Sequence, residues 1–382
     1  MRVAFYAPLK PPDHPVPSGD RRMAGLLMQA LRQAGHEVAL AARLRSRDPA
    51  GDPERQARLH ALGDRLAARL ARRYRAAPAA ARPDAWFTYH LYYKAPDWIG
   101  PAVARALAIP YLVAEASHAP KRAGGPWHAS HAATEAALRQ AAAVIGLNPR
   151  DSACLRPLVP ADRLYLMKPF LDPAPYRAAH AARAGHRAEI AAAHALPLDT
   201  PWLLAAAMMR AGDKLASYRL LARALGTIEE RPWHLLILGD GPARAEVAAA
   251  FAGFGDRAVF AGAQPPDRLA AFCAAADLMV WPAINEAYGM ALLEAQASGL
   301  PVIAGDSGGV SAIVAEGVTG RVVPAGDAAA FAGAVAALLD APDALAAMGT
   351  AALDKTAREH GLAGAADFLD GVLRRAVAEK AA

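Results

Sequence analysis

Short apolar runs alternate along the chain with longer segments in which apolar residues recur every three or four positions. The short runs are bounded by glycine, proline or polar residues and predict buried strands, whereas the longer segments predict helices. Strands are expected over residues 2–7, 36–41, 86–92, 111–116, 143–147 and 164–170, and again over 202–208, 234–238, 258–262, 278–281, 301–304 and 322–324. Strands that alternate with helices in this way predict an α/β protein with parallel sheets.

The length of the chain and one proline-rich segment predict two domains. A chain of 382 residues exceeds what one hydrophobic core usually serves. Pro169, Pro173 and Pro175 lie around the end of the sixth expected strand, as in a linker. We therefore expect a first domain over residues 1–172, a second over 173–362, and a terminal helix within 363–382.

Two glutamates, Glu286 and Glu294, lie on either side of the start of an expected helix over residues 289–298. The loop before this helix and the glycine turn at 306–309 are both expected at the carboxyl edge of a parallel sheet, where open α/β sheets bind nucleotides. Along a continuous helix, eight positions correspond to a rise of about 12 Å. The carboxyl pair of a glycosidase needs a separation of only about 5–10 Å. A break at Gly289 could shorten the distance, and the pair could also be ordinary surface carboxylates. The spacing nevertheless better suits two contacts with one extended ligand.

This stretch resembles the donor-binding signature of retaining glycosyltransferases of the GT-B fold, most closely the large group 1 family (family 4). The resemblance rests on Glu286 and Glu294 together with Gly289, the run 299–302 and the pair Gly308–Gly309. It implies two Rossmann-like parallel-sheet domains facing each other across a cleft, with a C-terminal helix crossing back to the first domain. It also implies retaining transfer of a sugar from a nucleoside-diphosphate-sugar, with UDP or GDP as nucleotide, to a hydroxyl of a glycan, lipid or small molecule.

The resemblance assigns roles to individual residues. Arg210 and Lys214 correspond to the cations that hold the departing diphosphate, although they stand one position closer than is usual in the family. Glu286 corresponds to a residue that contacts sugar hydroxyls or lies beneath the anomeric carbon, and Glu294 to one that binds the ribose. His118, after a first-domain strand, corresponds to a histidine that orients the sugar. The other expected donor-binding residues are Gly19, Gly239, Gly241, Ala287, Tyr288, Gly289 and Met290.

Some of these positions also have purely structural explanations. Ser18 beside Gly19 is a suitable helix N-cap, and Lys214 could pair with Asp213 at a helix start. The run from Gly239 to Pro242 is expected mainly to shape the floor under the nucleotide. The family usually has a glutamate where Ala312 stands, so the role of that carboxylate is missing or relocated.

The sequence indicates neither a metal nor another cofactor. It contains no Asp-x-Asp, so we expect Arg and Lys to replace a metal ion, and the departing phosphate to take the acceptor proton without a separate base. The absence of Gly-x-Gly-x-x-Gly disfavours a dehydrogenase. The alternatives are a nucleotide-sugar epimerase or phosphorylase on the same fold, and a catalytically silent nucleotide-sugar binding protein.

The first domain offers weaker signals for an acceptor. Lys121, Arg122, His90 and Asn148 follow expected strands and are acceptor-side candidates. Residues 43–75 carry ten arginines against four acidic residues. Within this segment, the helix 54–75 has one stripe of leucines (59, 62, 66 and 70) and one of arginines (58, 65, 69 and 72). Such a helix can lie on anionic lipid, or it can simply present a solvated face.

Composition narrows the picture further. With 54% hydrophobic and 20% charged residues the chain is globular, and its net charge of +6 favours anionic partners. No zinc-finger or RNA-binding signature occurs, so nucleic acid is not an expected partner. Cys154 and Cys273 are expected to be reduced thiols. No run of eighteen apolar residues occurs, and we expect a cytoplasmic protein with peripheral contact at the inner face of the membrane.

Overall fold

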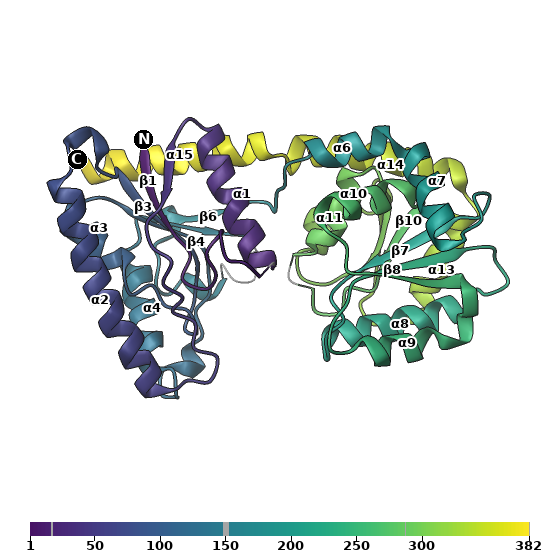
Figure 1. Ribbon diagram of the computed structural model, residues 1–382, viewed down its shortest axis with the longest axis horizontal. Helices are drawn as coiled ribbons and strands as arrows, with labels where there is room; N and C mark the ends of the chain where they lie inside the picture. Colours follow the sequence, from purple (N-terminus) through teal and green to yellow (C-terminus); the bar gives the residue numbers. More distant parts are fainter. Residues whose placement is uncertain (17, 148–152, 287, 382) are drawn as a thin grey trace. The chain divides into compact units, whose positions relative to one another are not determined.

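The computed structural model describes residues 1–16, 18–147, 153–286 and 288–381 (Figure 1). The chain divides into two compact units, one formed by Met1–Lys168 with Leu362–Ala382 and the other by Pro169–Gly361. The division falls between Lys168 and Pro169, four residues before the predicted boundary at residue 172. The C-terminal helix α15 (Leu362–Ala381) is part of the first unit, where it packs against α1 (Gly19–Gln33).

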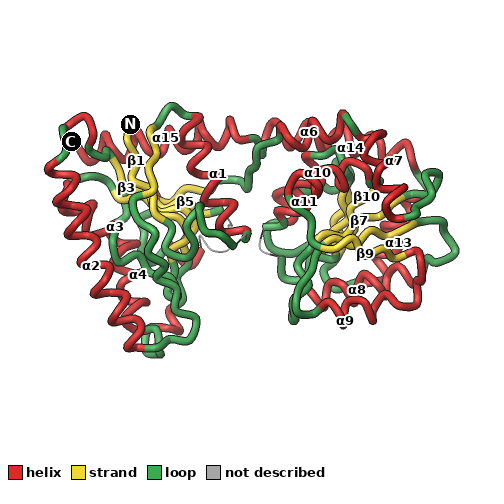
Figure 2. The backbone as a smooth tube through the Cα atoms, viewed as in Figure 1, coloured by secondary structure: helices red, strands yellow, loops and turns green. Residues whose placement is uncertain are grey.

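The first unit contains a six-stranded parallel sheet with helices on both of its sides (Figure 2). In spatial order its strands are β2 (Glu37–Leu40), β1 (Arg2–Tyr6), β3 (Ala85–Leu91), β4 (Tyr111–Ala116), β5 (Ala143–Gly146) and β6 (Leu164–Leu166). Besides α1 and α15, its helices include α2 (Pro53–Ala76), α3 (Gly100–Leu107) and α4 (His128–Gln140). Because β1 lies between β2 and β3, the strand order reverses there, which creates a switch point at the carboxyl edge.

The second unit repeats this architecture with a different strand order. Its parallel sheet runs β12 (Gly320–Val323), β11 (Val302–Gly305), β10 (Leu278–Trp281), β7 (Trp202–Ala206), β8 (His234–Leu238) and β9 (Ala258–Gly262). The helices are α6 (Ala174–Ala181), α7 (Arg183–His194), α8 (Asp213–Gly226), α9 (Arg244–Phe251), α10 (Pro266–Ala275), α11 (Met290–Ala297), α12 (Val310–Ile313), α13 (Ala328–Leu339) and α14 (Pro342–Glu359). Its switch point lies between β7 and β10, and the predicted α/β class with parallel sheets is confirmed.

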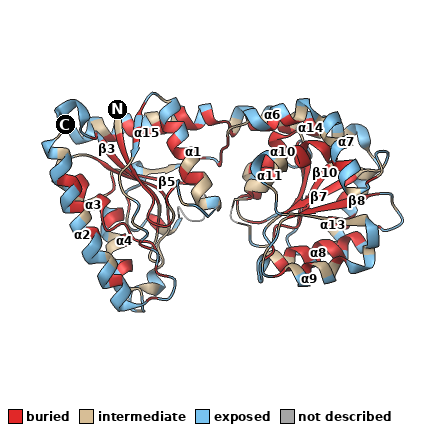
Figure 3. Ribbon diagram, viewed as in Figure 1, coloured by how far each residue is buried: buried red, intermediate tan, exposed pale blue. Residues whose placement is uncertain are grey.

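The central strands are buried along their whole length (Figure 3). Every residue of β7, β10 and β11 is buried, because helices cover both faces of the sheet. Parallel strands in this position are continuous apolar runs, which is the pattern that predicted them. Strand β6 is shorter than predicted and ends at Leu166, since Pro169 has no N–H group with which to continue the ladder.

The buried face of α2 differs from the predicted leucine stripe. Its buried residues are Gln56, Gly63, Ala67, Leu70 and Ala71, whereas Leu62 is exposed. The reason is close packing: a Cβ atom on Gly63 would lie 2.3 Å from the Cβ atom of Trp98. A helix that approaches its neighbour this closely buries small residues. Among the leucines, Leu70 is buried and Leu66 packs against the core, whereas Leu62 remains at the surface.

None of the helices in the described parts of the chain is, by itself, long and apolar enough to cross a membrane. Helices α13 and α14 meet the length and composition criteria only as a pair, and the two are bent by 100° relative to each other.

Candidate active site

Two loops at the switch point of the second unit carry the main candidate residues. The strands β7 and β10 are adjacent and parallel, so the loops that follow them leave the same edge of the sheet. Each loop ends in a glycine with a left-handed backbone, Gly212 (φ 81°) before α8 and Gly289 (φ 74°) before α11. Within the described residues, no side chain caps either helix. The first N–H groups of both helices therefore remain available to an anion.

Lys214 and Glu286 meet across these two loops. The Nζ atom of Lys214 lies 2.5 Å from Oε2 of Glu286, and both side chains are about four-fifths buried, with exposed fractions of 21% and 16%. The indole Nε1–H of Trp281, at the end of β10, donates to the same Oε2 at 3.3 Å. The Lys214 ammonium also lies 5.3 Å from the centroid of the Trp281 ring. The structure thus brings together two of the predicted residues as a largely buried ion pair beside the Trp281 ring.

The loop that carries Glu286 is strained and held by hydrogen bonds. Asn285 has a left-handed backbone (φ 49°), and its side-chain amide donates to Asp213 Oδ2 at 3.0 Å. The Glu286 N–H donates to Ser307 Oγ at 3.1 Å, and the Ile284 N–H donates to Ser217 Oγ at 3.1 Å. Left-handed non-glycine residues cost about 1–3 kcal/mol each and persist where their surroundings enforce them. The loop is therefore fixed in a specific conformation.

Sequence reasoning did not identify the residues that hold this loop. Ser307 lies in the glycine turn 306–309, which was recognised only for its glycines. Ser217 lies in the first turns of α8 and Trp281 at the end of a buried strand, where an apolar pattern hides them. Only their positions could have identified them, since all three residues lie at the carboxyl ends of strands or near the starts of the helices that follow.

Arg210 and Glu294 lie apart from this ion pair. Arg210 is exposed, in the loop before α8, and its guanidinium makes no hydrogen bond or ion pair within the described residues. Glu294 lies in α11 and is buried, with 4% of its surface exposed. Burial raises the pKa of the Cys273 thiol well above its ordinary value, and the negative charge of Glu294 adds to this shift. Such a pKa keeps Cys273 an unreactive thiol.

Two glycines in the turn between β8 and α9 pack against the loop that carries Arg210. Gly239 (φ 131°) and Gly241 (φ 150°) have backbones that side chains rarely adopt. A Cβ atom would lie 2.0 Å from the carbonyl oxygen of Ala207 at Gly239, and 2.3 Å from that of Met209 at Gly241. The two glycines therefore let the turn lie directly against the loop that carries Arg210. Both glycines thus support that loop.

The remaining predicted donor residues lie around the start of α11. Gly289 forms the N-cap of this helix, and Tyr288 and Met290 beside it are half-buried. Ala287, predicted as a donor-binding residue, and Asn148, predicted on the acceptor side, both lie outside the described residues.

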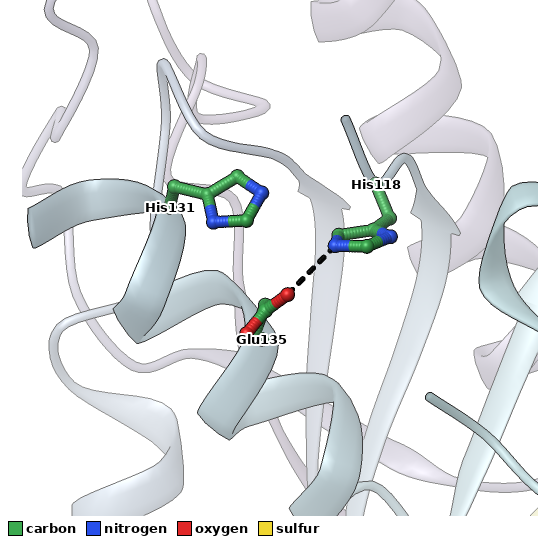
Figure 4. A group of neighbouring side chains, drawn as sticks. All are labelled: His118, His131 and Glu135. Carbon is green, nitrogen blue, oxygen red and sulfur yellow. Dashed lines mark hydrogen bonds and ion pairs between the residues drawn. The ribbon is translucent and has the colours of Figure 1, made fainter. Parts of the chain in front are cut away.

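In the first unit, His118 belongs to a cluster with two residues of α4 (Figure 4). Its Nε2 atom lies 2.8 Å from Oε1 of Glu135, and its ring centroid lies 5.2 Å from that of His131. Burial lowers the pKa of His131. Burial also tends to raise the pKa of Glu135, but the hydrogen bond with His118 and the charge of Arg139 outweigh it, so the carboxyl pKa lies below its ordinary value. His131 and Glu135 were not predicted, although a spacing of four on an expected helix places them on one face.

A second cluster lies at the switch point between β1 and β3. His90 Nδ1 lies 2.9 Å from Oδ1 of Asp20 and 3.8 Å from Oε1 of Glu115. Both His90 (φ 63°) and Glu115 (φ 56°) have left-handed backbones. Burial tends to raise the pKa of Asp20, but the hydrogen bond with His90 lowers it below its ordinary value overall. Gly19 opens α1 next to this cluster, and Ser18 is the N-cap, accepting from the Arg21 N–H at 3.2 Å.

The two cations predicted on the acceptor side lie on a short turn after β4. Lys121 is exposed, and the guanidinium carbon of Arg122 lies 5.2 Å from the ring centroid of Trp127. Arg122 is thus fixed against an aromatic ring, whereas Lys121 points to solvent. Neither residue belongs to the His90 or His118 clusters as these are defined by their contacts.

Comparison with known proteins adds family information to this geometry. The profile of the family described as glycosyl transferases group 1 matches residues 200–341, which include both loops of the ion pair. A D-inositol 3-phosphate glycosyltransferase of Nocardia farcinica is 37% identical over 203 residues, covering 50% of this chain and 43% of that protein. The aligned region thus spans less than half of that relative's length.

Solved structures share the fold of the whole chain. Sucrose-phosphate synthase of Thermosynechococcus elongatus superposes with a TM-score of 0.71 at 22% identity, covering 99% of this chain and 100% of the other. The Anabaena protein HepE in complex with UDP-glucose gives a TM-score of 0.70 at 14% identity, with 98% and 100% coverage. Residues 200–341 are therefore similar to the glycosyl transferases group 1 family, and the two units of the chain have the GT-B fold.

Proposed function

We propose that this protein is a retaining glycosyltransferase that moves a sugar from a nucleoside-diphosphate-sugar to an acceptor hydroxyl. The observation that carries the proposal is the Lys214–Glu286 ion pair between two uncapped helix starts at a topological switch point. A fixed cation beside free N–H groups suits a diphosphate, and a carboxylate beside that cation suits sugar hydroxyls. The family match to the same segment and the fold shared with a protein that binds UDP-glucose support this assignment.

Lys214 and Arg210 stabilise the leaving diphosphate in this proposal. The bond between the anomeric carbon and the phosphate oxygen breaks, and a bond from the same carbon to the acceptor oxygen forms on the same face. The leaving phosphate oxygen takes the acceptor proton. Negative charge therefore grows on the diphosphate. The fixed Lys214 ammonium and the N–H groups at the start of α11 are preorganised to stabilise this charge, and the exposed Arg210 guanidinium adds a second cation. With these groups in place the transfer does not require a metal ion.

The carboxylates and His118 hold the rest of the donor. Glu286, already fixed by Trp281 and by its backbone N–H, accepts hydrogen bonds from sugar hydroxyls. Glu294, in α11, is assigned to the ribose. His118 is assigned to orient the donor sugar through its Nε2 atom.

The acceptor is assigned to the first unit. Asp20, His90 and Glu115 form a half-buried cluster that combines hydrogen-bond acceptors with a titratable ring, which suits a hydroxyl compound. The exposed arginines of α2 (58, 65, 69 and 72) provide contact with anionic lipid if the acceptor lies in a membrane. Co-sedimentation with vesicles of neutral and of anionic lipid tests that contact, and equal binding to both would contradict it.

Donor turnover provides the test of the proposed function. A thermal-shift screen of UDP-, GDP- and ADP-sugars selects the nucleotide, after which release of the nucleoside diphosphate is measured. We expect Lys214→Ala to lower turnover by about 100-fold or more, because it removes one preorganised donor. Arg223→Ala is the matched control, since it removes one exposed positive charge at the other end of the same helix.

Three outcomes separate the alternatives. A wild-type protein that binds a nucleotide sugar but never turns it over is a binding protein, and release of sugar phosphate from a glycan indicates a phosphorylase. Transfer with inversion, seen in the anomeric proton signal of the product, would refute the retaining mechanism while leaving the transferase assignment intact.

A further inference from the structure

Three potential metal ligands converge in the first unit, outside the ion pair of the second. His131 and Glu135 lie one turn apart on the same face of α4, and His118 reaches them from the loop after β4 (Figure 4). One ligand atom from each residue lies within 4.8 Å of the other two. Two ligands four positions apart on a helix, completed by a third from elsewhere in the chain, is an arrangement that binds zinc in other proteins.

His131 is the first of two reasons to expect a cation here. The residue is 3% exposed, and among the described residues its Nε2 atom has no hydrogen-bond partner. A buried polar atom without a partner costs free energy, and native proteins rarely leave one unsatisfied. Its ring lies beside His118 and Glu135, so a cation held by those two residues would also satisfy the imidazole of His131.

The contacts of His118 are the second reason. Its Nδ1 atom lies 3.3 Å from the carbonyl oxygen of Cys154, and its Nε2 atom faces Oε1 of Glu135 at 2.8 Å. In metal-binding histidines the nitrogen that does not bind the ion is usually hydrogen-bonded to a carbonyl or carboxylate, and the Cys154 carbonyl occupies that position here. The ring is thereby held with its other nitrogen toward the Glu135 carboxylate.

We propose that His118, His131 and Glu135 bind a divalent transition-metal ion, with Zn²⁺ as the preferred ion. Two imidazoles and one carboxylate are a ligand set of Zn²⁺, whereas Mg²⁺ and Ca²⁺ take oxygen ligands. Tetrahedral ligand bonds of about 2.0–2.2 Å place two ligand atoms about 3.4 Å apart. The Nε2 atom of His118 and Oε1 of Glu135, which are 2.8 Å apart, must therefore separate slightly to take an ion between them. His118 is also assigned to the donor sugar, and one Nε2 lone pair serves either the metal or the sugar. Metal binding is therefore expected to inhibit transfer.

Metal binding without donor or acceptor tests this inference separately from the proposed function. The full chain is stripped with EDTA, dialysed, and titrated with ZnSO₄ in a calorimeter, with MgSO₄ as the comparison ion. We expect one Zn²⁺ per chain and no binding of Mg²⁺. His131→Ala and Glu135→Gln should each weaken Zn²⁺ binding by about 100-fold, since each removes a ligand and leaves only two.

His128→Ala is the matched control, because His128 is exposed on the same helix and lies outside the cluster. It should bind Zn²⁺ like the wild type. Far-ultraviolet circular dichroism establishes that each variant is folded, and Glu135→Gln, which conserves shape, serves if His131→Ala does not fold. Visible absorption of bound Co²⁺, lost in the ligand variants, gives a second readout. Wild-type protein that binds no Zn²⁺, or a folded ligand variant that binds it with wild-type affinity, would overturn the inference.

Discussion

The Lys214–Glu286 ion pair makes opposite predictions for its two members when a nucleoside diphosphate binds without a sugar. Lys214 is the cation that the diphosphate needs, whereas Glu286 competes with the diphosphate for that cation. Lys214→Met removes the charge and retains most of the side-chain volume. Glu286→Gln removes the competing charge and retains the shape, including an oxygen that can accept from the Trp281 indole. We expect the first change to weaken binding and the second to strengthen it.

The magnitudes follow from the burial of the pair. Two unit charges about 4 Å apart attract by about 4 kcal/mol at an effective dielectric constant of about 20, and by about 1 kcal/mol in water. Both side chains keep roughly a fifth of their exposure, so desolvation and solvent screening reduce the net value to about 1 kcal/mol. Releasing Lys214 from the pair should then tighten diphosphate binding by up to about fivefold. Losing its charge-assisted hydrogen bond to phosphate, about 1.5–3 kcal/mol, should weaken binding by about 10- to 150-fold.

Isothermal titration with the nucleoside diphosphate selected by the donor screen measures both effects. The double variant completes the cycle. It should bind the diphosphate somewhat more tightly than Lys214→Met alone, because without the ammonium the carboxylate repels the diphosphate. The intact nucleotide sugar serves as a second ligand, and Glu286→Gln should weaken its binding relative to the diphosphate. If Glu286→Gln weakened diphosphate binding as strongly as Lys214→Met, the reasoning would be wrong, since the carboxylate would then be a positioning group for the cation.

Three further predictions concern the supports of the site and the stability of the second unit. Gly241→Ala should weaken nucleotide binding by about 10- to 100-fold, because its Cβ atom would displace the loop that carries Arg210; Gly253→Ala, which meets no neighbouring atom, is the control in the same titration. Ala195→Gly should raise the free energy of unfolding by about 0.5–1 kcal/mol, because Ala195 ends α7 in a left-handed conformation (φ 53°) that glycine adopts without strain. Ala192→Gly, inside the same helix, should lower it by about 1 kcal/mol in the same urea melts. Burial and the charge of Arg257 lower the pKa of His234, so below about pH 6.5 the unfolded chain binds a proton that the folded chain does not. The melting temperature should therefore fall between about pH 7.5 and about pH 5.5, and a His234→Gln variant with the same pH dependence would contradict this assignment.

The strands could be predicted from the sequence because of where they lie. Strands such as β7 and β10 are covered on both faces, so each is a continuous apolar run that stands out between polar loops. Their order in the sheet could not be predicted in the same way. The local pattern of apolar residues indicates that a segment is buried, but not which strands lie beside it. One neighbour of β7 is β10, which comes after two other strands in the sequence.

In the candidate site, too, local motifs could be predicted from the sequence, whereas contacts between distant residues could not. Lys214 and Glu286 were predicted because each belongs to a short local motif, whereas their contact joins residues 72 positions apart. The contact between His118 and Glu135 could not be predicted, because the two residues lie 17 positions apart, one after a strand and one on a helix, and no local motif contains both. The buried face of α2 could not be predicted from its leucines alone, because close packing against Trp98 leaves room only for a small residue at Gly63.

Residues with a strained backbone gather at the carboxyl edge of each sheet, and this observation does not depend on any comparison with other proteins. Among the described residues, six other than glycine have a positive φ angle: His90, Ala108, Glu115, Ala195, Ala283 and Asn285. Two of these residues, Ala108 and Ala195, end helices, where a left-handed residue is common. The other four lie at the carboxyl ends of β3, β4 and β10 or in the loop that follows. Such strain is retained where a side chain must be held in a fixed direction, and here it coincides with the two switch points that carry the His90 cluster and the Lys214–Glu286 pair. Strand topology and strain thus select one edge of the sheet in each unit independently of the family match, which lies within the second unit.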